Sequence, residues 1–220
     1  MVSVIIPAYN EEHTIGNIIR QIRALDPDYE IIVINDGSTD GTAEAAETAG
    51  ATILNHPYNK GNGAAIKSGI RQAKGETLVF MDADGQHDPG DIARLLKYFP
   101  EYDMVVGFRK LGGQTSFVRA AGNKVYNWLA SYVAKFRIKD LTSGFRAVKA
   151  EIARSLLYLL PNTYSYPTTM TLSVLRNGRS LKYVPIGVES RKRGKSDIGI
   201  FKDGARFFII IVKICTLYSP

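Results

Sequence analysis

With 220 residues, 45% hydrophobic and 22% charged, the chain has the composition of one globular domain with a substantial core. Its single cysteine excludes a disulfide framework and a zinc site built on several cysteines, and fits a reduced, cytosolic setting. The net charge of +7 is unevenly divided: residues 1–108 hold 8 Lys/Arg against 16 Asp/Glu, whereas residues 109–220 hold 20 against 5. This division favours an acidic half that binds a metal and a nucleotide, and a basic half that meets an anionic partner. No zinc-finger, RRM or KH signature indicates nucleic acid.

The first half of the chain alternates short apolar runs with segments of helical spacing. Strands are predicted at 2–6, 29–34, 52–54, 77–81 and 104–108. Helices are predicted at 12–24, over an alanine-rich stretch that ends at Ala49, at 63–73, and at 88–98 with Asp88 as N-cap. Repeated β-α units of this kind predict an α/β fold with a mostly parallel, Rossmann-like sheet flanked by helices.

The second half is less regular. It predicts a long helix over 116–136, a polar loop over 140–144 and an edge strand over 145–148. Helices near 151–160 and 167–176 follow, and then a strand over 181–189 that Pro185 confines to an edge or a bulge.

Two aspartates, Asp82 and Asp84, follow the apolar run 77–81 and precede the turn residue Gly85. Residues at the carboxyl end of such a strand point into the crevice where open α/β sheets bind ligands. Two carboxylates there repel each other unless a cation or a proton relieves them. Mg²⁺ or Mn²⁺ bound to a diphosphate does so, because hard cations prefer carboxylate and phosphate oxygens. A pair of solvated turn aspartates is the alternative, since Asp-x-Asp is a common string.

Three further polar clusters follow predicted strands, at 7–12, 36–38 and 58–66. Tyr9 can stack on a base, and Glu11 and Asp36 can accept hydrogen bonds from a base or a ribose hydroxyl. The glycine-rich cluster opens a helix, whose first N–H groups are available to ligand oxygens, but it is neither a Rossmann fingerprint nor a Walker A loop. Each cluster alone is typical of an ordinary turn or helix cap. Their convergence on one sheet edge indicates a nucleotide site.

Taken in order, these motifs resemble family 2 glycosyltransferases, which have the GT-A fold. The resemblance rests on VIIPAYNE (4–11), NDGS (35–38), NKGNGA (59–64) and DADGQH (82–87). It continues through GFR (107–109), Arg119, DLTSGF (140–145) and RKRGKS (191–196), and so covers nearly the whole chain. Within the family, the chain most resembles the dolichyl- or polyprenyl-phosphate sugar synthases. The donor sugar is not encoded in these motifs.

The resemblance implies a role for each matching residue. The nucleotide-sugar pocket would comprise Pro7, Ala8, Tyr9, Glu11, Asp36, Lys60, Gly61, Asp82, Ala83 and Asp84, with Arg193, Lys195 and Ser196 on a loop that closes over the diphosphate. Asp82, Asp84 and Gln86 would hold Mg²⁺ or Mn²⁺, and Arg109, Arg119 and Asn123 the acceptor phosphate; Asp82, Asp84, Arg109 and Arg119 form the catalytic set. His87 is expected to support or cap the turn. Phe108 and Arg146 depart from the family pattern, in which a small and an apolar residue are frequent, and so bear on the acceptor or sugar site.

The implied reaction is an inverting, metal-dependent transfer of a hexose from a UDP- or GDP-linked donor to the phosphate of a polyprenyl or dolichyl phosphate. Such an acceptor is already an anion, so it needs cationic positioning rather than a strong base. Asp140 is therefore expected to anchor an arginine. If Asp140 were instead a base, the chain would be a family 2 enzyme acting on a polysaccharide or glycolipid hydroxyl. A nucleotidyltransferase would carry a Gly-rich loop with Arg and Lys after the first strand, which is absent here, and the acidic cluster counts against a non-enzymatic basic module.

Residues 200–218 predict an amphipathic helix at a membrane surface, because the apolar run 207–212 is flanked by Arg206 and Lys213. The run is far shorter than the roughly 20 residues that cross a bilayer. We therefore expect a catalytic domain over 1–198 and a surface helix over 199–220, which in relatives precedes transmembrane segments. Peripheral attachment to the cytoplasmic face of the membrane follows. A core helix packed on the sheet is the alternative, and the oligomeric state is left open, a homo-oligomer included.

Overall fold

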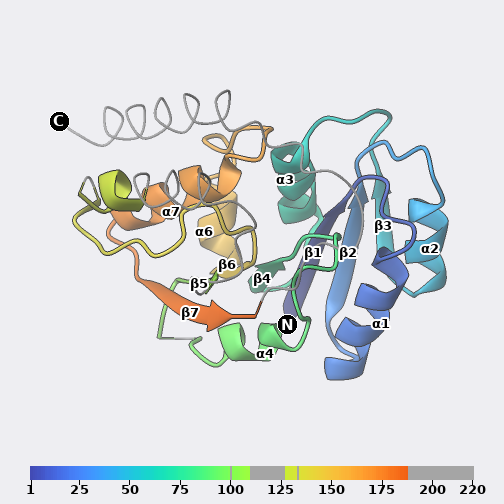
Figure 1. The fold of residues 1–220 in the computed structure, drawn as a ribbon, viewed down its shortest axis with the longest axis horizontal. Helices are drawn as coiled ribbons and strands as arrows, with labels where there is room; N and C mark the ends of the chain where they lie inside the picture. Colours follow the sequence, from blue (N-terminus) through green and yellow to red (C-terminus); the bar gives the residue numbers. More distant parts are fainter. Residues whose placement is uncertain (100, 110–126, 133, 188–220) are drawn as a thin grey trace.

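A computed structural model describes residues 1–99, 101–109, 127–132 and 134–187 (Figure 1). Within them, seven strands form one sheet: β1 (Val2–Ala8), β2 (Glu30–Asn35), β3 (Thr52–Asn55), β4 (Thr77–Phe80), β5 (Met104–Arg109), β6 (Arg146–Lys149) and β7 (Leu181–Ile186). The helices are α1 (Ile15–Leu25), α2 (Thr42–Thr48), α3 (Asn62–Gln72), α4 (Asp91–Leu96), α6 (Ala150–Ser155) and α7 (Tyr166–Arg176). Residues 127–132 and 134 are also helical.

The sheet has the strand order β3-β2-β1-β4-β6-β5-β7. The pairs β1–β2, β2–β3, β1–β4 and β5–β7 are parallel, whereas β6 runs antiparallel to β4 and β5. The mostly parallel sheet predicted from the sequence is confirmed, and β7 lies at an edge, as Pro185 predicts. The prediction of an edge strand over 145–148 is wrong. β6 is internal because it pairs with β4 on one side and β5 on the other. Both of its faces are also covered, since Ala147 belongs to one core and Val148 to the other.

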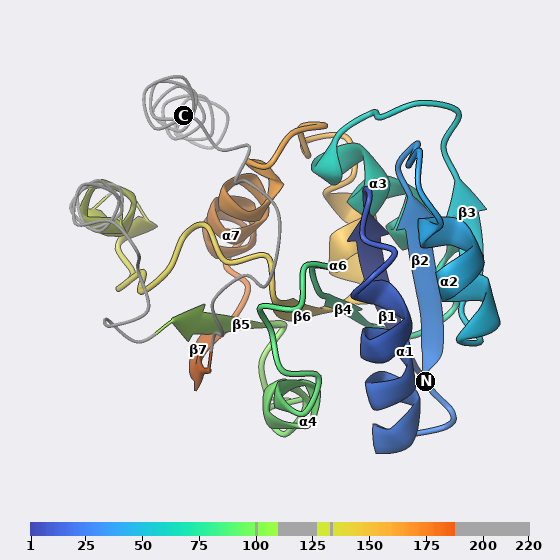
Figure 2. The same ribbon diagram turned by 45° about the vertical axis from the view of Figure 1, so that its right-hand side comes forward.

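Alternating side chains of the strands build a separate core on each face of the sheet. Ile5, Ile32 and Phe80 belong to the core that α3, α6 and α7 cover. Their sequence neighbours, such as Val4 and Val79, belong to the core that α1, α2 and α4 cover. The result is a three-layer arrangement with helices on both faces (Figures 1 and 2), which is what continuous apolar strands require.

Several predicted boundaries shift. The first helix begins at Ile15 rather than at residue 12, because Glu11 bonds Thr42 at the start of α2 and the Glu12 carboxylate accepts the N–H of Gly41 in the loop before it. Asp88 is not the N-cap of α4: its carboxylate accepts the N–H of Gly90 at 2.8 Å in the turn that precedes the helix. The described part of the helix predicted over 116–136 ends near Lys135, which has a φ of 49°. Residues 116–126 and the predicted surface helix over 199–220 lie outside the described residues. Among the helices that are described, none is long and apolar enough to span a membrane.

Candidate functional site

The loops that follow β1 and β2 are tied together at the carboxyl edge of the sheet. The N–H of Asn10 donates to Ser38 Oγ at 3.0 Å, and the N–H of Glu11 donates to Thr42 Oγ1 at 2.8 Å. In return, the N–H of Thr39 donates to Asn10 Oδ1 at 2.9 Å. Asn10 takes a left-handed conformation, with a φ of 55°, which asparagine tolerates better than most residues. This pairing leaves the ring of Tyr9 exposed at the edge.

Asp36 is buried, and its carboxylate organises the neighbouring loop. Oδ1 accepts the N–H of Lys60 at 3.0 Å and lies 2.6 Å from His56 Nδ1, while Oδ2 accepts the N–H of Gly61 at 2.8 Å. His56 Nε2 in turn lies 2.8 Å from Ser68 Oγ on α3. The structure thus brings Asp36, Lys60 and Gly61 together, as the motifs predict. The sequence predicts that Asp36 lies at the carboxyl edge of the sheet. It does not reveal that the Asp36 carboxylate also holds the loop of Lys60 and Gly61 in place.

At the start of α3, one of the N–H groups that the sequence predicts to be available to a ligand is already bonded. The N–H of Ala64 donates to the carbonyls of Gly61, at 2.9 Å, and Asn162, at 3.2 Å. A Cβ on Gly63 would lie 2.1 Å from the carbonyl oxygen of Pro161, so only glycine permits this approach. A distant turn at 161–163 therefore covers the helix start, which no local pattern could show.

The turn after β4 carries the predicted metal ligands. Thr14 Oγ1, at the start of α1, donates to the carbonyl of Ala83 at 2.7 Å, and the N–H of Gln86 donates to Asp84 Oδ1 at 3.1 Å. Asp82 lies against a second loop: a Cβ on Gly144 would be 3.0 Å from Asp82 Oδ2 and 3.4 Å from Tyr166 Oη. Burial and the nearby charge of Asp82 raise the pKa of Tyr166, so its hydroxyl stays protonated.

The donor set of this turn suits a hard divalent cation. Two carboxylates and one amide oxygen are the ligands that Mg²⁺ and Mn²⁺ accept, and diphosphate and water commonly complete such sites. Within the described ranges, no cluster of three or more His, Cys, Asp or Glu side chains could hold a metal on its own. A cation at Asp82, Asp84 and Gln86 would therefore depend on the oxygens of a bound ligand.

His87 packs beneath this turn. Its ring stacks on Phe145, with the centroids 5.1 Å apart and an interplanar angle of 17°. Burial lowers the pKa of His87, despite the nearby carboxylate of Asp84, so the ring is neutral at pH 7. This arrangement agrees with the expectation that His87 supports the turn.

Arg109, at the end of β5, forms a bidentate ion pair with Asp140. Nε lies 3.0 Å from Asp140 Oδ2 and Nη2 lies 3.3 Å from Oδ1, and Nη2 also donates to Thr142 Oγ1 at 3.0 Å. Burial alone would lower the pKa of Arg109, but the carboxylate of Asp140 raises it, so the guanidinium stays charged. Asp140 has the geometry of the predicted anchor, because both of its oxygens already bind Arg109. The other predicted residues of this half, Arg119, Asn123, Arg193, Lys195 and Ser196, lie outside the described residues.

Arg146, which departs from the family pattern, is fully buried beside this loop. Its guanidinium donates to the carbonyl of Pro167 at 3.0 Å, to Thr171 Oγ1 at 3.1 Å and to the carbonyl of Ser143. Burial lowers its pKa, although Tyr166 and nearby carboxylates favour the charged form. Arg146 thus joins the 140–144 loop to α7. The sequence marks this position only as a departure from the family pattern and does not reveal the role.

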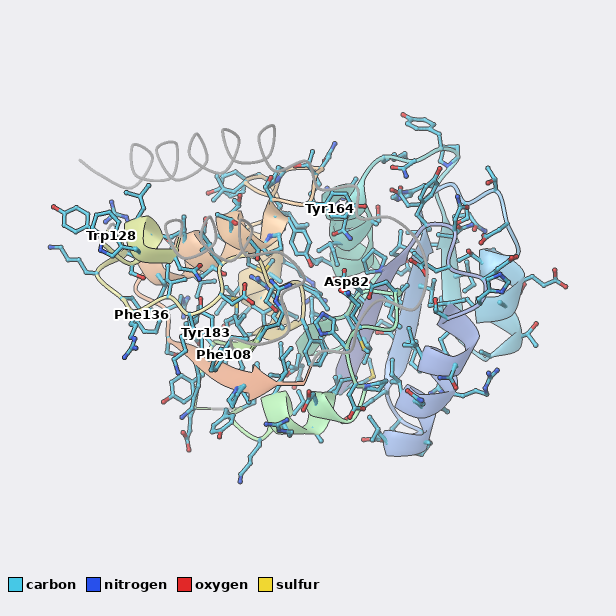
Figure 3. The ribbon with its side chains drawn as sticks, in the orientation of Figure 1. Asp82, Phe108, Trp128, Phe136, Tyr164 and Tyr183 are labelled. Carbon is cyan, nitrogen blue, oxygen red and sulfur yellow. The ribbon has the colours of Figure 1, made fainter. Side chains whose placement is uncertain are left out.

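Phe108, the other departure, lies in an aromatic cluster with Tyr183 and Phe136 (Figure 3). The rings of Phe108 and Tyr183 meet edge to face at 6.2 Å, and Lys139 Nζ lies 4.6 Å above the Phe108 ring. The cluster packs the end of β5 against the segment that leads to Asp140.

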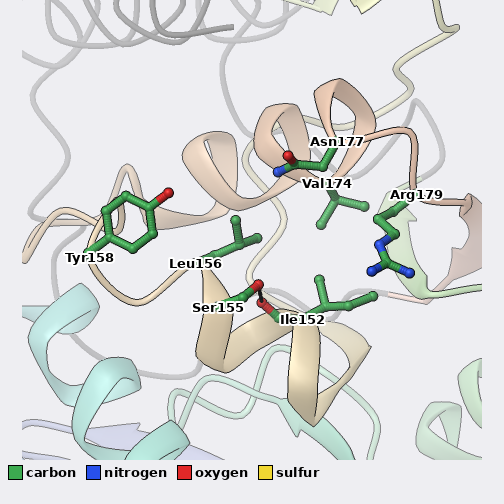
Figure 4. Close-up of a pocket in the computed structure, with 7 residues that line it drawn as sticks. All are labelled: Ile152, Ser155, Leu156, Tyr158, Val174, Asn177 and Arg179. Carbon is green, nitrogen blue, oxygen red and sulfur yellow. Dashed lines mark hydrogen bonds between the residues drawn. The ribbon is translucent and has the colours of Figure 1, made fainter.

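A cavity of about 290 Å³ lies between α6 and α7 (Figure 4). Its lining comprises Ile152, Ser155, Leu156, Tyr158, Val174, Asn177 and Arg179. None of these belongs to the predicted site. The functional edge is thus defined by the strand ends and not by this cavity.

Comparison with solved structures confirms the fold. Glucosyl-3-phosphoglycerate synthase from Mycobacterium tuberculosis, in complex with Mn²⁺, UDP-glucose and phosphoglyceric acid, matches with a TM-score of 0.80 at 22% identity, over 98% of this chain and 80% of that one. The same enzyme with Mg²⁺ and UDP matches with a TM-score of 0.76, over 98% and 79% of the two chains. The chain has the GT-A fold that its motifs predict.

Sequence relatives extend the match. An uncharacterized protein of Methanocaldococcus jannaschii is 32% identical over 96% of this chain and 91% of its own length. The undecaprenyl-phosphate mannosyltransferase of Micrococcus luteus is 30% identical over 89% of this chain and 86% of its own. An undecaprenyl-phosphate 4-deoxy-4-formamido-L-arabinose transferase of Proteus mirabilis is 33% identical over 71% of this chain and 51% of its own. The profile described as Glycosyl transferase family 2 matches residues 3–157. With that match, the GT-A sheet and the acidic turn at its carboxyl edge, the chain belongs to glycosyl transferase family 2 and is a glycosyltransferase.

Proposed function

We propose that this glycosyltransferase moves a hexose from a UDP- or GDP-linked donor to the phosphate of a polyprenyl or dolichyl phosphate, with inversion at the anomeric carbon. Residues 1–198 form the catalytic domain. The observation that carries the proposal is the Arg109–Asp140 pair, which holds a charged guanidinium beside the acidic turn. Two relatives are named as transferases that act with undecaprenyl phosphate, and a solved structure of the same fold contains Mn²⁺, UDP-glucose and phosphoglyceric acid.

The donor binds over the loops that follow β1, β2 and β4. Tyr9 stacks on the base, and the loop held by Asp36 lines the nucleotide pocket together with Pro7, Ala8, Glu11, Lys60, Gly61 and Ala83. Asp82, Asp84 and Gln86 would hold Mg²⁺ or Mn²⁺, which as a Lewis acid neutralises charge on a departing diphosphate. Arg193 and Lys195 bring further positive charge to the diphosphate.

The acceptor phosphate is positioned by Arg109, together with Arg119 and Asn123. One phosphate oxygen attacks the anomeric carbon as the bond from that carbon to the diphosphate oxygen breaks, so the nucleoside diphosphate leaves with the bonding electrons. No proton has to be removed from a phosphate that is already ionised at neutral pH. Asp140 keeps the guanidinium of Arg109 oriented, and charge-assisted hydrogen bonds of this kind are about twice as strong as neutral ones.

The experiment that tests the proposal measures sugar transfer with two classes of acceptor. Purified protein is incubated with Mn²⁺ and either UDP- or GDP-linked hexoses, together with a polyprenyl phosphate or a polyprenol that lacks the phosphate. We expect transfer to the phosphate only, and its loss on chelation of the metal. Transfer to a hydroxyl acceptor in its place would contradict the proposal.

Asp140→Asn separates the anchor from a base. If Asp140 is an anchor, its replacement by Asn should weaken the use of the acceptor by roughly 10- to 100-fold, because Arg109 loses one charge-assisted contact of about 1.5–3 kcal/mol. If Asp140 is a general base, the same replacement should lower kcat by about 10²–10⁴-fold, with little change in the acceptor KM. The second pattern would favour a hydroxyl acceptor.

We also propose peripheral attachment to the cytoplasmic face of the membrane through residues 199–220. Co-sedimentation of the full chain with anionic liposomes, compared with a chain that ends at Ser196, tests this attachment. If both proteins stay in the supernatant at low salt, and the shorter chain is shown to be folded, the attachment is refuted.

A further inference from the structure

Three polar side chains from different segments form a line of hydrogen bonds behind the loop at 58–61. Asp36 follows β2, His56 follows β3, and Ser68 lies on α3. Asp36 Oδ1 lies 2.6 Å from His56 Nδ1, and His56 Nε2 lies 2.8 Å from Ser68 Oγ. β2 and β3 are paired strands at one end of the sheet, and α3 packs against that end (Figure 1). One imidazole ring thus connects the Asp36 carboxylate to a helix behind it.

This line has the order of groups found in serine hydrolases, but Ser68 is not placed as a nucleophile. Ser68 lies in the second turn of α3, which spans Asn62–Gln72. Inside a helix, each backbone N–H bonds to the carbonyl four residues earlier, so within α3 no pair of N–H groups near Ser68 can bind an oxyanion. The line therefore serves Asp36, at its other end, rather than Ser68.

The contacts of the His56 ring fix its direction. Both oxygens of Asp36 already accept backbone N–H groups of the loop, so His56 Nδ1 carries the proton of the 2.6 Å contact. In the neutral ring Nε2 is then the acceptor for the hydroxyl of Ser68. The backbone N–H of His56 also donates to the carbonyl of Asn35 at 2.9 Å. His56 is therefore held at its backbone and at both ring nitrogens.

These contacts limit what Asp36 can offer to a ligand. A carboxylate has about four acceptor positions, two on each oxygen. Oδ1 uses both of its positions, on the N–H of Lys60 and on His56 Nδ1. Among the described residues, Oδ2 accepts only the N–H of Gly61, at 2.8 Å. One acceptor position remains, on Oδ2, whereas without His56 there would be one on each oxygen.

A single acceptor position distinguishes between the two bases that the proposed donors carry. Uracil presents one N–H, at N3 between two carbonyls, and needs one acceptor. Guanine presents the N1–H and the N2 amino group side by side, which a carboxylate meets best with one oxygen for each. A guanine at Asp36 would leave one of these donors unpaired, and sites reject ligands for which a buried polar group stays unpaired.

We propose that His56, held by Ser68, is a positioning residue of the donor site that occupies Asp36 Oδ1 and thereby selects a uracil base over guanine. The proposal deepens the proposed function and rests on it for the place of Asp36 in the nucleotide pocket. It assigns a UDP-linked donor to this enzyme, and it gives His56 and Ser68 a role in the choice of donor.

Calorimetry of the full-length protein with UDP and with GDP, in Mn²⁺ and without acceptor, tests the choice of base. We expect UDP to bind roughly tenfold or more tightly than GDP, because GDP leaves one donor of its base unpaired. Equal affinities, or tighter binding of GDP, would overturn the proposal. Because no acceptor is present, a failure to transfer sugar to polyprenyl phosphate refutes the proposed function and leaves this measurement valid.

Variants of His56 test whether it sets the preference. His56→Ala frees Asp36 Oδ1 and should reduce the ratio of UDP affinity to GDP affinity by roughly tenfold. His56→Asn keeps an N–H donor for Oδ1 and should retain most of the ratio. Asp103→Asn is the control for a loss of stability alone, since Asp103 bonds Lys149 and Ser180 at the opposite edge of the sheet, and its ratio should stay that of the wild type. An unchanged ratio in His56→Ala, or equal ratios in the two His56 variants, would contradict the proposal.

A double-mutant cycle tests the part played by Ser68. Ser68→Ala should lower the ratio by a smaller factor than His56→Ala, because the ring loses one of its two side-chain partners. Added to His56→Ala, it should cause no further change, since Ser68 acts only through the ring. Additive effects would refute the role assigned to Ser68. If His56→Ala fails to fold, the wild-type ratio and the folded Ser68→Ala and His56→Asn variants still decide the proposal.

Discussion

Asp36→Asn should destabilise the protein through the loop at 58–61. Asp36 is 3% exposed, and its carboxylate accepts from Lys60 N at 3.0 Å and Gly61 N at 2.8 Å, with His56 Nδ1 at 2.6 Å. An asparagine keeps one oxygen, so if that oxygen serves Lys60 and His56, its amide faces the buried N–H of Gly61. Losing a charged acceptor costs about 1.5–3 kcal/mol, and leaving a buried donor unpaired costs about 1–3 kcal/mol. Because the two terms overlap, we expect the free energy of unfolding to fall by about 2–4 kcal/mol.

Urea unfolding followed by circular dichroism measures this loss. Asp26→Asn is the matched control, because Asp26 accepts a single N–H from Asp28 at 2.9 Å in an exposed turn. Its free energy of unfolding should stay within about 0.5 kcal/mol of the wild type. Calorimetry on the folded variant should also show weaker binding of the nucleotide-sugar, since the loop beside the pocket loosens. An Asp36→Asn protein as stable as Asp26→Asn would refute the reasoning.

Four further predictions concern the metal ligand, the acceptor arginines, the start of α3 and the carboxylate of Asp103. Asp84→Ala should abolish metal-dependent transfer in a folded protein, as the loss of a metal ligand removes several kcal/mol of Lewis-acid stabilisation; near-normal turnover with an unchanged metal requirement would refute the assignment. Arg109→Ala and Arg119→Ala should each weaken use of the acceptor by about 1.5–3 kcal/mol and leave donor affinity close to normal, in separate kinetic and binding measurements. Gly63→Ala should lower the free energy of unfolding by about 1–3 kcal/mol, because its Cβ would meet the Pro161 carbonyl oxygen at 2.1 Å. Gly16→Ala, at the same position of α1, would meet nothing closer than 3.4 Å and should be neutral or slightly stabilising. Burial alone would raise the pKa of Asp103, but hydrogen bonds from Lys149 and Ser180 lower it. The ionised carboxylate therefore stabilises the folded protein at pH values above its unfolded pKa of about 3.9. This stabilisation is lost as the pH falls through the lower pKa that Asp103 has in the folded protein. When unfolding is measured at about pH 5 and about pH 3, the free energy of unfolding should therefore fall more for the wild type than for Asp103→Asn.

The sequence predicts those parts of the site in which a polar residue directly follows a strand that can be recognised from its apolar run. Asp82 and Asp84 follow an apolar strand directly, so their place at the carboxyl edge needs only the strand to be recognised. The same holds for Asp36, Arg109 and the loop at 58–61. The parallel sheet follows in the same way, because the alternation of strands and helices leaves little other choice.

The features that were missed depend on contacts between distant segments. The turn at 161–163 that covers the start of α3 lies about a hundred residues from it in the chain. β6 reads as a short, isolated run, and its central place follows only from its pairing with β4 and β5. Arg146 looks out of place in an apolar strand until the carbonyls of Ser143 and Pro167 are seen around it.

The antiparallel direction of β6 has a consequence for how this enzyme could diversify. Because β6 runs opposite to β4 and β5, the loop that enters it reaches the same edge that the other strands reach as they end. Apart from the 191–196 loop, the residues assigned to the donor all precede β5. The residues assigned to the acceptor begin at Arg109, the last residue of β5, and continue after it. A junction in the turn near residues 101–103 would exchange one set for the other without cutting a strand. Chimaeras joined there, between relatives that use different acceptors, should inherit acceptor choice from the segment after the junction and nucleotide choice from the segment before it.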